Sequence, residues 1–177
     1  MTYPKEILEK AAKIKLLICD VDGVLSDGKV YFSNQQEELK NFNIKDGLGI
    51  KLMQKHGIKV AIITGRKSHI VAHRAQELGI ELVYQGRSDK RATFDEIAAN
   101  LNLSAEEIAH IGDDLPDLPL MKKAGLGICV ADAYHFLLQQ SDWSTPHDGG
   151  SGAVRDVADL LLTAQNKLDQ ILESYLK

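Results

Sequence analysis

Side chains able to bind a metal ion and a phosphate group follow one another along the chain, each near the end of a short apolar run. They are, in order, Asp20 and Asp22, Thr64, Lys90, and Asp113 and Asp114. Ligands of open parallel sheets bind at the carboxyl ends of the strands, so we expect these side chains to converge on one rim. Several carboxylates, one hydroxyl and one ammonium at one rim indicate metal-assisted chemistry on a phosphate.

The segment Asp20-Val21-Asp22-Gly23 is the most informative of these. Residues i and i+2 of an extended chain point to the same side, so the two carboxylates can share a site. Such a pair suits metal binding, or a division into nucleophile and acid/base. Taken alone, the motif fits a strand-end turn with two solvated acids equally well. The apolar run before it and the partners downstream favour a site.

The other three segments are each weaker. Thr64 and Gly65 offer a hydroxyl and backbone amides to a phosphate, or simply cap the next helix. Lys90 opposes the helix dipole near a helix start, which suits neutralising a phosphate, although a solvated lysine is the alternative. Asp113 and Asp114 supply oxygen ligands of the kind Mg²⁺ prefers. Their alternative is an acidic loop before a helix that begins at Pro116, for which Asp117 is the expected cap.

Alternating apolar runs and amphipathic stretches predict the elements that position these residues. The expected strands cover residues 14–19, 59–64, 81–84, 108–111 and 126–130, and the expected helices residues 46–56, 68–78, 88–101, 116–124 and about 153–175. This order predicts a Rossmann-like, doubly wound α/β fold with a parallel sheet. A β-hairpin at about 29–43 follows the first strand. The glycine-rich stretch 145–152 is expected to be flexible.

Length and composition narrow the function classes. The 177 residues suit a single domain, 1–177. The net charge of −4 argues against nucleic acid as a partner. Apolar runs stay well short of ~20 residues, and the N-terminus lacks a secretory signal pattern, so we expect no membrane insertion and a cytoplasmic location. Cys19 and Cys129 are expected to be buried, reduced thiols; a disulfide or a metal pair is the alternative.

In their order and spacing, the four segments resemble the motifs of the haloacid dehalogenase-like (HAD) superfamily of phosphohydrolases. The longer stretches CDVDGVLSDG, FNIKDG, ITGR, GDDLPDL and GGSGAVRD resemble the 3-deoxy-D-manno-octulosonate (KDO) 8-phosphate phosphatases over nearly the whole chain. This resemblance implies Mg²⁺-dependent hydrolysis of the sugar-acid phosphate to KDO and phosphate. It also implies an aspartyl-phosphate intermediate and a place in lipopolysaccharide precursor biosynthesis.

The resemblance also implies a role for each matching position. Asp20 would be the nucleophile and a metal ligand, and Asp22 would be the acid/base, with its backbone carbonyl toward the metal. Thr64 would bind the phosphate, and Lys90 would contact both the phosphate and Asp20. Asp113 would be the third metal ligand, and Asp114 and Gly65 would support the site. The substrate contacts would be Asp22, Asn43, Ile44, Lys45, Asp46, Gly47, Lys51, Arg66, Arg74 and Lys90. Lys51 stands where these enzymes usually have an arginine, so it lacks the bidentate fork for a carboxylate.

The spaces between the motifs are too short for the separate cap domain that covers the site in many HAD enzymes, so we expect a capless fold. An open site admits water and selects poorly, and a neighbouring subunit is the simplest lid. The resembling phosphatases form tetramers, and their glycine-rich tail enters an adjacent active site. We therefore expect a homotetramer, with the 29–43 hairpin assembling the chains.

Three alternatives stay open. A phosphatase for a nine-carbon sugar-acid 9-phosphate would share every catalytic residue. A catalytically silent HAD-like assembly module would not need the intact set of Asp20, Asp22, Lys90 and Asp113. A broad housekeeping phosphatase is disfavoured by the missing cap and by the cluster of cationic residues.

Overall fold

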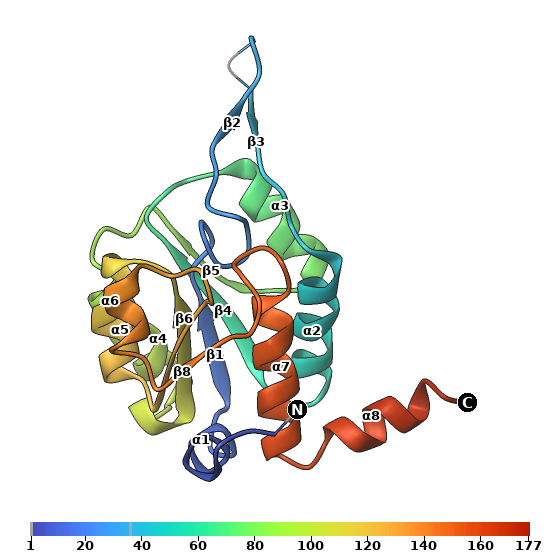
Figure 1. Cartoon of the computed structure of the whole chain (residues 1–177). Coiled ribbons are helices and arrows are strands. Elements are labelled where there is room, and N and C mark those ends of the chain that lie inside the picture. The colour runs from blue at the N-terminus through green and yellow to red at the C-terminus, as the bar shows by residue number, and fades with distance from the viewer. Residues whose placement is uncertain (1, 36) are drawn as a thin grey trace.

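A six-stranded parallel sheet forms the centre of the protein in a computed structural model, which describes residues 2–35 and 37–177 (Figure 1). The strands lie in the order β5-β4-β1-β6-β7-β8. Their bounds are β1 Leu16–Cys19, β4 Lys59–Thr64, β5 Leu82–Gln85, β6 Ile108–Gly112, β7 Leu126–Cys129 and β8 Trp143–Ser144. Chain order reverses direction on either side of β1, so the doubly wound fold predicted from the sequence is confirmed.

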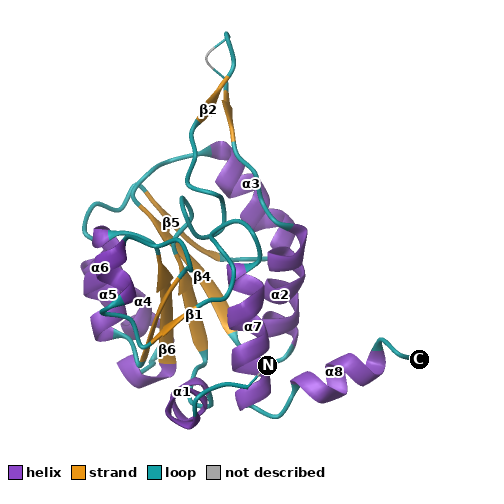
Figure 2. Ribbon diagram, in the orientation of Figure 1, coloured by secondary structure: helices purple, strands orange, loops and turns teal. Residues whose placement is uncertain are grey.

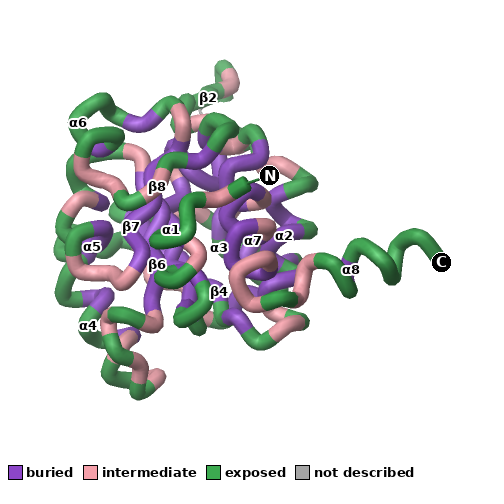
Figure 3. Tube along the Cα trace, turned by 60° about the horizontal axis from the view of Figure 1, so that its bottom comes forward, coloured by how far each residue is buried: buried purple, intermediate pink, exposed green. Residues whose placement is uncertain are grey.

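Helices cover both faces of this sheet (Figure 2). The helices of the described residues are α1 Lys5–Ala11, α2 Ile44–Lys55, α3 His69–Leu78, α4 Lys90–Leu101, α5 Leu118–Lys123, α6 His135–Leu138, α7 Ala153–Ala164 and α8 Leu168–Ser174, of which α8 projects away from the sheet. Alternate residues of β1 point to opposite faces. Leu17 and Cys19 pack with apolar residues of α1, α2, α3 and α7, whereas Leu16 and Ile18 pack with those of α4 and α5. β1 is thus buried on both faces, and Asp20 follows at its carboxyl end. Buried residues fill the interior between the outer helices (Figure 3).

The predicted hairpin is present but short. Its strands are β2 Tyr31–Phe32 and β3 Glu38–Leu39, paired antiparallel, and they stand away from the sheet at one end of the molecule (Figure 1). Val30, Phe32 and Leu39 are exposed on it. Apart from this hairpin, the described chain between β1 and β4 holds only α2, so the capless architecture is confirmed.

The C-terminal region departs from the prediction of one helix over 153–175. α7 ends at Ala164, and α8 begins only at Leu168. Asn166 adopts a left-handed conformation (φ 55°), which stops a helix, and Lys167 Nζ donates to His56 O at 2.8 Å. The helical spacing of apolar residues continues across this break, so periodicity alone missed it. The short elements α1, α6 and β8 were also missed.

The glycine-rich stretch 145–152 is packed against its own chain rather than free. The Gly150 N–H donates to Val24 O at 2.9 Å, and the Gly149 N–H donates to Asp132 Oδ1 at 2.9 Å. A Cβ atom on Gly149 would lie 1.8 Å from Gly23 O, so only glycine permits this approach. These contacts connect the predicted flexible segment to the loop after β1 and to Asp132 after β7.

Candidate active site

Three carboxylates meet at the carboxyl edge of the sheet. Asp20 follows β1, Asp113 follows β6, and Asp117 lies in the next turn; one oxygen of each falls within 4.8 Å of the others. Thr64 ends β4 and is buried beside this edge, and its Oγ1 accepts from the Arg66 N–H at 3.4 Å. Of the side chains expected at this rim, Asp20, Thr64 and Asp113 therefore lie at the same edge of the sheet.

Lys90 is the cation of this group. It is the first residue of α4 and is buried, with its Nζ 2.9 Å from Asp20 Oδ1 and 2.7 Å from Asp117 Oδ1. Burial alone would lower the pKa of Lys90, but the two carboxylates outweigh burial and raise it. A lysine is unfavourable at a helix start, and these two anions compensate for it. Lys90 is thus held as an ammonium beside Asp20.

Asp117 has a different role from the helix cap predicted for it. Its side chain makes no capping hydrogen bond to α5. Instead, its Oδ1 accepts from Lys90 and from His110 Nε2 (3.2 Å), and its Oδ2 accepts from the Asp113 N–H (3.2 Å). Burial opposes the charged form, but these donors hold the pKa of Asp117 at about 2. The signal that could have revealed this network is His110, a polar residue inside a buried strand.

Asp20 and Asp113 have fewer donors and are therefore suited to a cation. Burial, followed by the neighbouring Asp117 carboxylate, raises the pKa of Asp20 to about 6. Burial, followed by the Asp20 and Asp117 charges, raises the pKa of Asp113 to about 7. Gly23 (φ +94°) leaves room for Asp113, because a Cβ there would lie 2.1 Å from Asp113 Oδ2. The two carboxylates offer hard oxygen ligands, and a bound cation would relieve their mutual repulsion. Mg²⁺ prefers ligands of this kind.

The donors around Asp117 also indicate which groups would hold the ion. Both Asp117 oxygens are already engaged, so Asp20 and Asp113 fit the role of Mg²⁺ ligands best. Asp114 is exposed, and its Oδ1 accepts from the Leu115 N–H at 2.7 Å, so it shapes the loop after β6. Gly65 is exposed next to Thr64.

Asp22 faces the hairpin. Its Oδ1 is paired with Lys40 Nζ, a residue that the sequence did not single out. Lys40 Nζ also lies 3.4 Å from Glu38 Oε1, and Glu38 Oε1 accepts from Arg66 Nη2 at 2.6 Å. A chain of alternating charges therefore connects Asp22 to the loop after β4.

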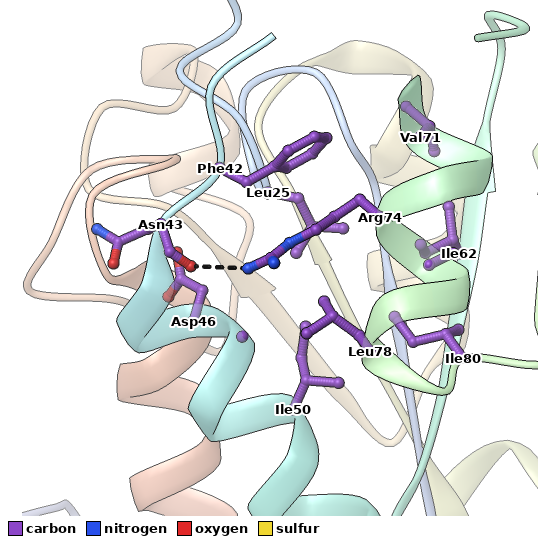
Figure 4. Close-up of a pocket in the computed structure, with 12 residues that line it drawn as sticks. Leu25, Phe42, Asn43, Asp46, Ile50, Ile62, Val71, Arg74, Leu78 and Ile80 are labelled. Atoms are coloured by element: carbon purple, nitrogen blue, oxygen red, sulfur yellow. Dashed lines mark hydrogen bonds between the residues drawn. The ribbon is translucent and has the colours of Figure 1, made fainter. Parts of the chain in front are cut away.

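The predicted sugar contacts are dispersed over the hairpin root, α2 and α3. Figure 4 shows a mainly apolar pocket between α2 and α3, to which Asn43, Asp46, Gly47 and Arg74 contribute. Arg74 Nη2 donates to Asn43 O at 3.5 Å, while its Nη1 pairs with Glu77 at 2.8 Å. A Cβ on Gly47 would lie 2.6 Å from Arg74 Nη2, so the glycine gives this arginine its space.

Asp46 is turned toward α7 and away from the solvent. It is buried, and its Oδ1 accepts from the Arg155 N–H at 2.8 Å, which satisfies a free donor at the start of α7. Burial is the largest cause that raises the pKa of Asp46 to about 6. Ile44, Lys45 and Lys51 are exposed on α2. The structure brings together Asp20, Lys90 and Asp113, but not this part of the predicted substrate set.

Comparisons with known proteins agree with this geometry. Residues 43–125 match the haloacid dehalogenase-like hydrolase family. The KDO 8-phosphate phosphatase KdsC of Yersinia pestis is 51% identical over 164 residues, which cover 93% of this chain and 88% of the relative. A probable YrbI family phosphatase from Pseudomonas syringae pv. phaseolica superposes with a TM-score of 0.97 at 44% identity, over 98% of this chain and 99% of the other.

A third relative carries ligands. The crystal structure of the Moraxella catarrhalis KDO 8-phosphate phosphatase, in complex with a magnesium ion, a phosphate ion and a KDO molecule, superposes with a TM-score of 0.95. It is 42% identical, over 98% of this chain and 99% of that one. The chain therefore belongs to the KDO 8-phosphate phosphatase family of HAD-like hydrolases, which are Mg²⁺-dependent phosphoric monoester hydrolases.

Proposed function

We propose that the protein hydrolyses KDO 8-phosphate to KDO and phosphate through an aspartyl-phosphate on Asp20. The observation that carries the proposal is the buried Asp20 carboxylate beside both the Lys90 ammonium and the Asp113 carboxylate. A nucleophile held next to a cation can approach an anionic phosphate, and the adjacent carboxylates can hold Mg²⁺. The relatives' names and the KDO-bound structure support this substrate.

In the first half of the reaction, an Asp20 carboxylate oxygen forms a bond to phosphorus. The bond between phosphorus and the sugar oxygen breaks, its electron pair stays on that oxygen, and Asp22 supplies the proton. Thr64 and Lys90 hold the phosphoryl oxygens during the transfer. Bound Mg²⁺ supplies further neutralisation of the phosphate charge.

In the second half, a water oxygen bonds to phosphorus and Asp22 takes the water proton. The bond from phosphorus to Asp20 breaks, its electron pair returns to the carboxylate, and phosphate leaves. Asp22 regains the proton that it gave up in the first half, so the cycle closes. A positioned acid/base of this kind contributes ~10²–10⁴-fold to the rate.

Recognition of the sugar acid falls to the cationic side of the site. Arg66 and Arg74 are the proposed partners of the substrate carboxylate, and the remaining proposed contacts are Asn43, Ile44, Lys45, Asp46, Gly47 and Lys51. Arg66 lies next to the catalytic edge, since its backbone N–H donates to Thr64 Oγ1. A planar guanidinium suits a carboxylate, which supports the assignment.

We further propose a homotetramer that works in the cytoplasm, in lipopolysaccharide precursor biosynthesis. The exposed apolar residues of the hairpin, Val30, Phe32 and Leu39, support assembly through this element. Among the described residues, helices of a length and apolarity that would cross a membrane are absent.

The test is kcat/KM over a panel of sugar phosphates, measured with and without Mg²⁺. We expect the highest value with KDO 8-phosphate and loss of turnover in a metal chelator. Higher activity on a nine-carbon sugar-acid 9-phosphate would reassign the substrate. Absence of turnover on the whole panel would point to the silent assembly module instead.

A further inference from the structure

The hairpin contributes a buried charge to the catalytic edge. The Lys40 side chain is 2% exposed, and its ammonium is paired with the Asp22 Oδ1 atom. A buried lysine is tolerated only where anions compensate for it, and here Asp22 and Glu38 both do so. An ammonium in this position acts on the Asp22 carboxylate with which it is paired.

The hairpin itself cannot hold Lys40 in place through its backbone. Among the hairpin residues that the structure describes, the ladder contains only the pairs Tyr31 with Leu39 and Phe32 with Glu38, and a short isolated hairpin has marginal stability in water. Side-chain contacts at its root fasten it instead. Glu38 accepts from Arg66 at the end of β4, and Tyr31 donates its hydroxyl to Asp27 Oδ2 at 2.7 Å.

This arrangement leaves Asp22 with two different oxygens. Oδ1 is engaged by Lys40, whereas Oδ2 has no recorded partner among the described residues and is available for proton transfer. Proton transfer needs the acid/base within hydrogen-bond reach of the reacting oxygen, so a fixed carboxylate orientation is worth a large factor in rate. Asp22 is part-exposed on a turn, and its own burial does not fix it.

We propose that Lys40 is a positioning residue for Asp22, with Glu38 holding Lys40 and linking it to Arg66. The inference rests on the proposed role of Asp22 as acid/base. It assigns a catalytic contribution to the hairpin of the same chain, in addition to the assembly role proposed above. Lys40 acts through Asp22 and does not itself touch the reacting atoms.

The test compares two substrates whose leaving groups differ in their need for an acid. p-Nitrophenolate leaves without protonation, whereas the sugar alkoxide of KDO 8-phosphate requires it. In Lys40→Met, kcat/KM for KDO 8-phosphate should fall at least about tenfold, while kcat/KM for p-nitrophenyl phosphate should change less than about threefold. Lys40→Arg should recover most of the loss.

Two comparisons complete the experiment. Lys29→Met removes an exposed lysine of the same hairpin, paired only loosely with Asp27 at 3.7 Å, and should match the wild type on both substrates. In an Asp22→Ala background, Lys40→Met should cause no further loss, because the two residues act as one unit. If the methionine variant does not fold, Lys40→Gln gives the same contrast between substrates.

An equal loss on both substrates, or a full additional loss in the Asp22→Ala background, would overturn the proposal and indicate a merely structural lysine. Wild-type kinetics in Lys40→Met would overturn it as well. Failure of the underlying assignment looks different: Asp22→Ala alone would then retain kcat/KM on KDO 8-phosphate. If the panel favours another sugar phosphate, that substrate takes the place of KDO 8-phosphate here.

Discussion

The two sides of the site are built in different ways. On the catalytic side, Asp20 and Lys90 are each 7% exposed, and the groups around them are linked by short contacts within one chain. On the sugar side, the Arg66 side chain is 45% exposed, and both Arg66 and Arg74 are paired with acids of their own chain. The first side is ready to bind metal and phosphate, whereas the second must exchange partners to bind a sugar carboxylate.

This difference separates the residues that carry out the reaction from those that select the substrate. Preorganised charges need no rearrangement when the reaction occurs, which is how such sites lower a barrier. These two arginines contribute only when a substrate displaces Glu38 or Glu77, so their effect depends on the substrate. Changes to the buried set of Asp20, Lys90 and Asp117 should therefore affect every phosphate ester, whereas changes to the arginines of the sugar side should affect only some.

The largest expected effect that tests this contrast belongs to Asp117. Asp117→Asn removes the charge that holds Lys90, His110 and the loop of Asp113, and loss of one partner from a buried pair costs ~3–5 kcal/mol. We expect kcat to fall at least ~10²-fold on every substrate, with a lower melting temperature. Asp95→Asn, on the same helix as Lys90 but exposed, is the matched control. Wild-type kcat in Asp117→Asn would show that the network is dispensable.

The sugar side should give a smaller, selective effect. Each charge-assisted contact to a carboxylate is worth ~1.5–3 kcal/mol, so Arg66→Met with Arg74→Met should cost at least ~10²-fold in kcat/KM for KDO 8-phosphate. With p-nitrophenyl phosphate the loss should stay below about threefold. Arg91→Met, an exposed arginine on α4, serves as the control. A uniform loss on both substrates would place these arginines in the structural framework instead.

The smallest effect concerns pH and Mg²⁺. The folded pKa values of Asp20 and Asp113, about 6 and about 7, lie above the ordinary 3.8, so their contribution to stability is present at low pH and lost as pH rises through 6–7. Bound Mg²⁺ would offset the repulsion between the ionised Asp20 and Asp113 carboxylates. The Mg²⁺-induced rise in melting temperature should thus be larger at pH 8 than at pH 5.5, by at least about 3 °C. Asp113→Asn should abolish this difference; an equal rise at both pH values would argue against these ligands.

The sequence predicted the catalytic side more fully than its surroundings. Asp20 follows a predicted strand and Lys90 begins a predicted helix. Both elements can be recognised from local sequence pattern, and the parallel sheet brings their ends together. Asp117 was misassigned because its partners lie on other elements. Lys40 was missed for the same reason: its pairing with Asp22 depends on how the hairpin folds back, which local pattern does not encode.

The course of the chain beyond β7 was harder to predict. The stretch 145–152 has the composition of a flexible connector, yet its glycines allow close contact with the loop after β1. Glycine content indicates which backbone conformations the stretch can adopt, but only the folded structure shows which residues it contacts. Asn166 illustrates the same point, since one left-handed residue divides an otherwise continuous helical pattern.

The most direct test of the central claim is to trap phosphate on Asp20. The enzyme is mixed with Mg²⁺ and p-nitrophenyl phosphate, whose leaving group needs no proton from Asp22, quenched in acid within one turnover, and digested for mass spectrometry. Asp22→Asn, in which the second half of the reaction is slowed, should carry one phosphoryl group on the peptide of residues 16–29, and Asp20→Asn/Asp22→Asn should carry none. A peptide that remains unmodified in Asp22→Asn while product forms, or that is still modified without Asp20, would contradict the covalent mechanism.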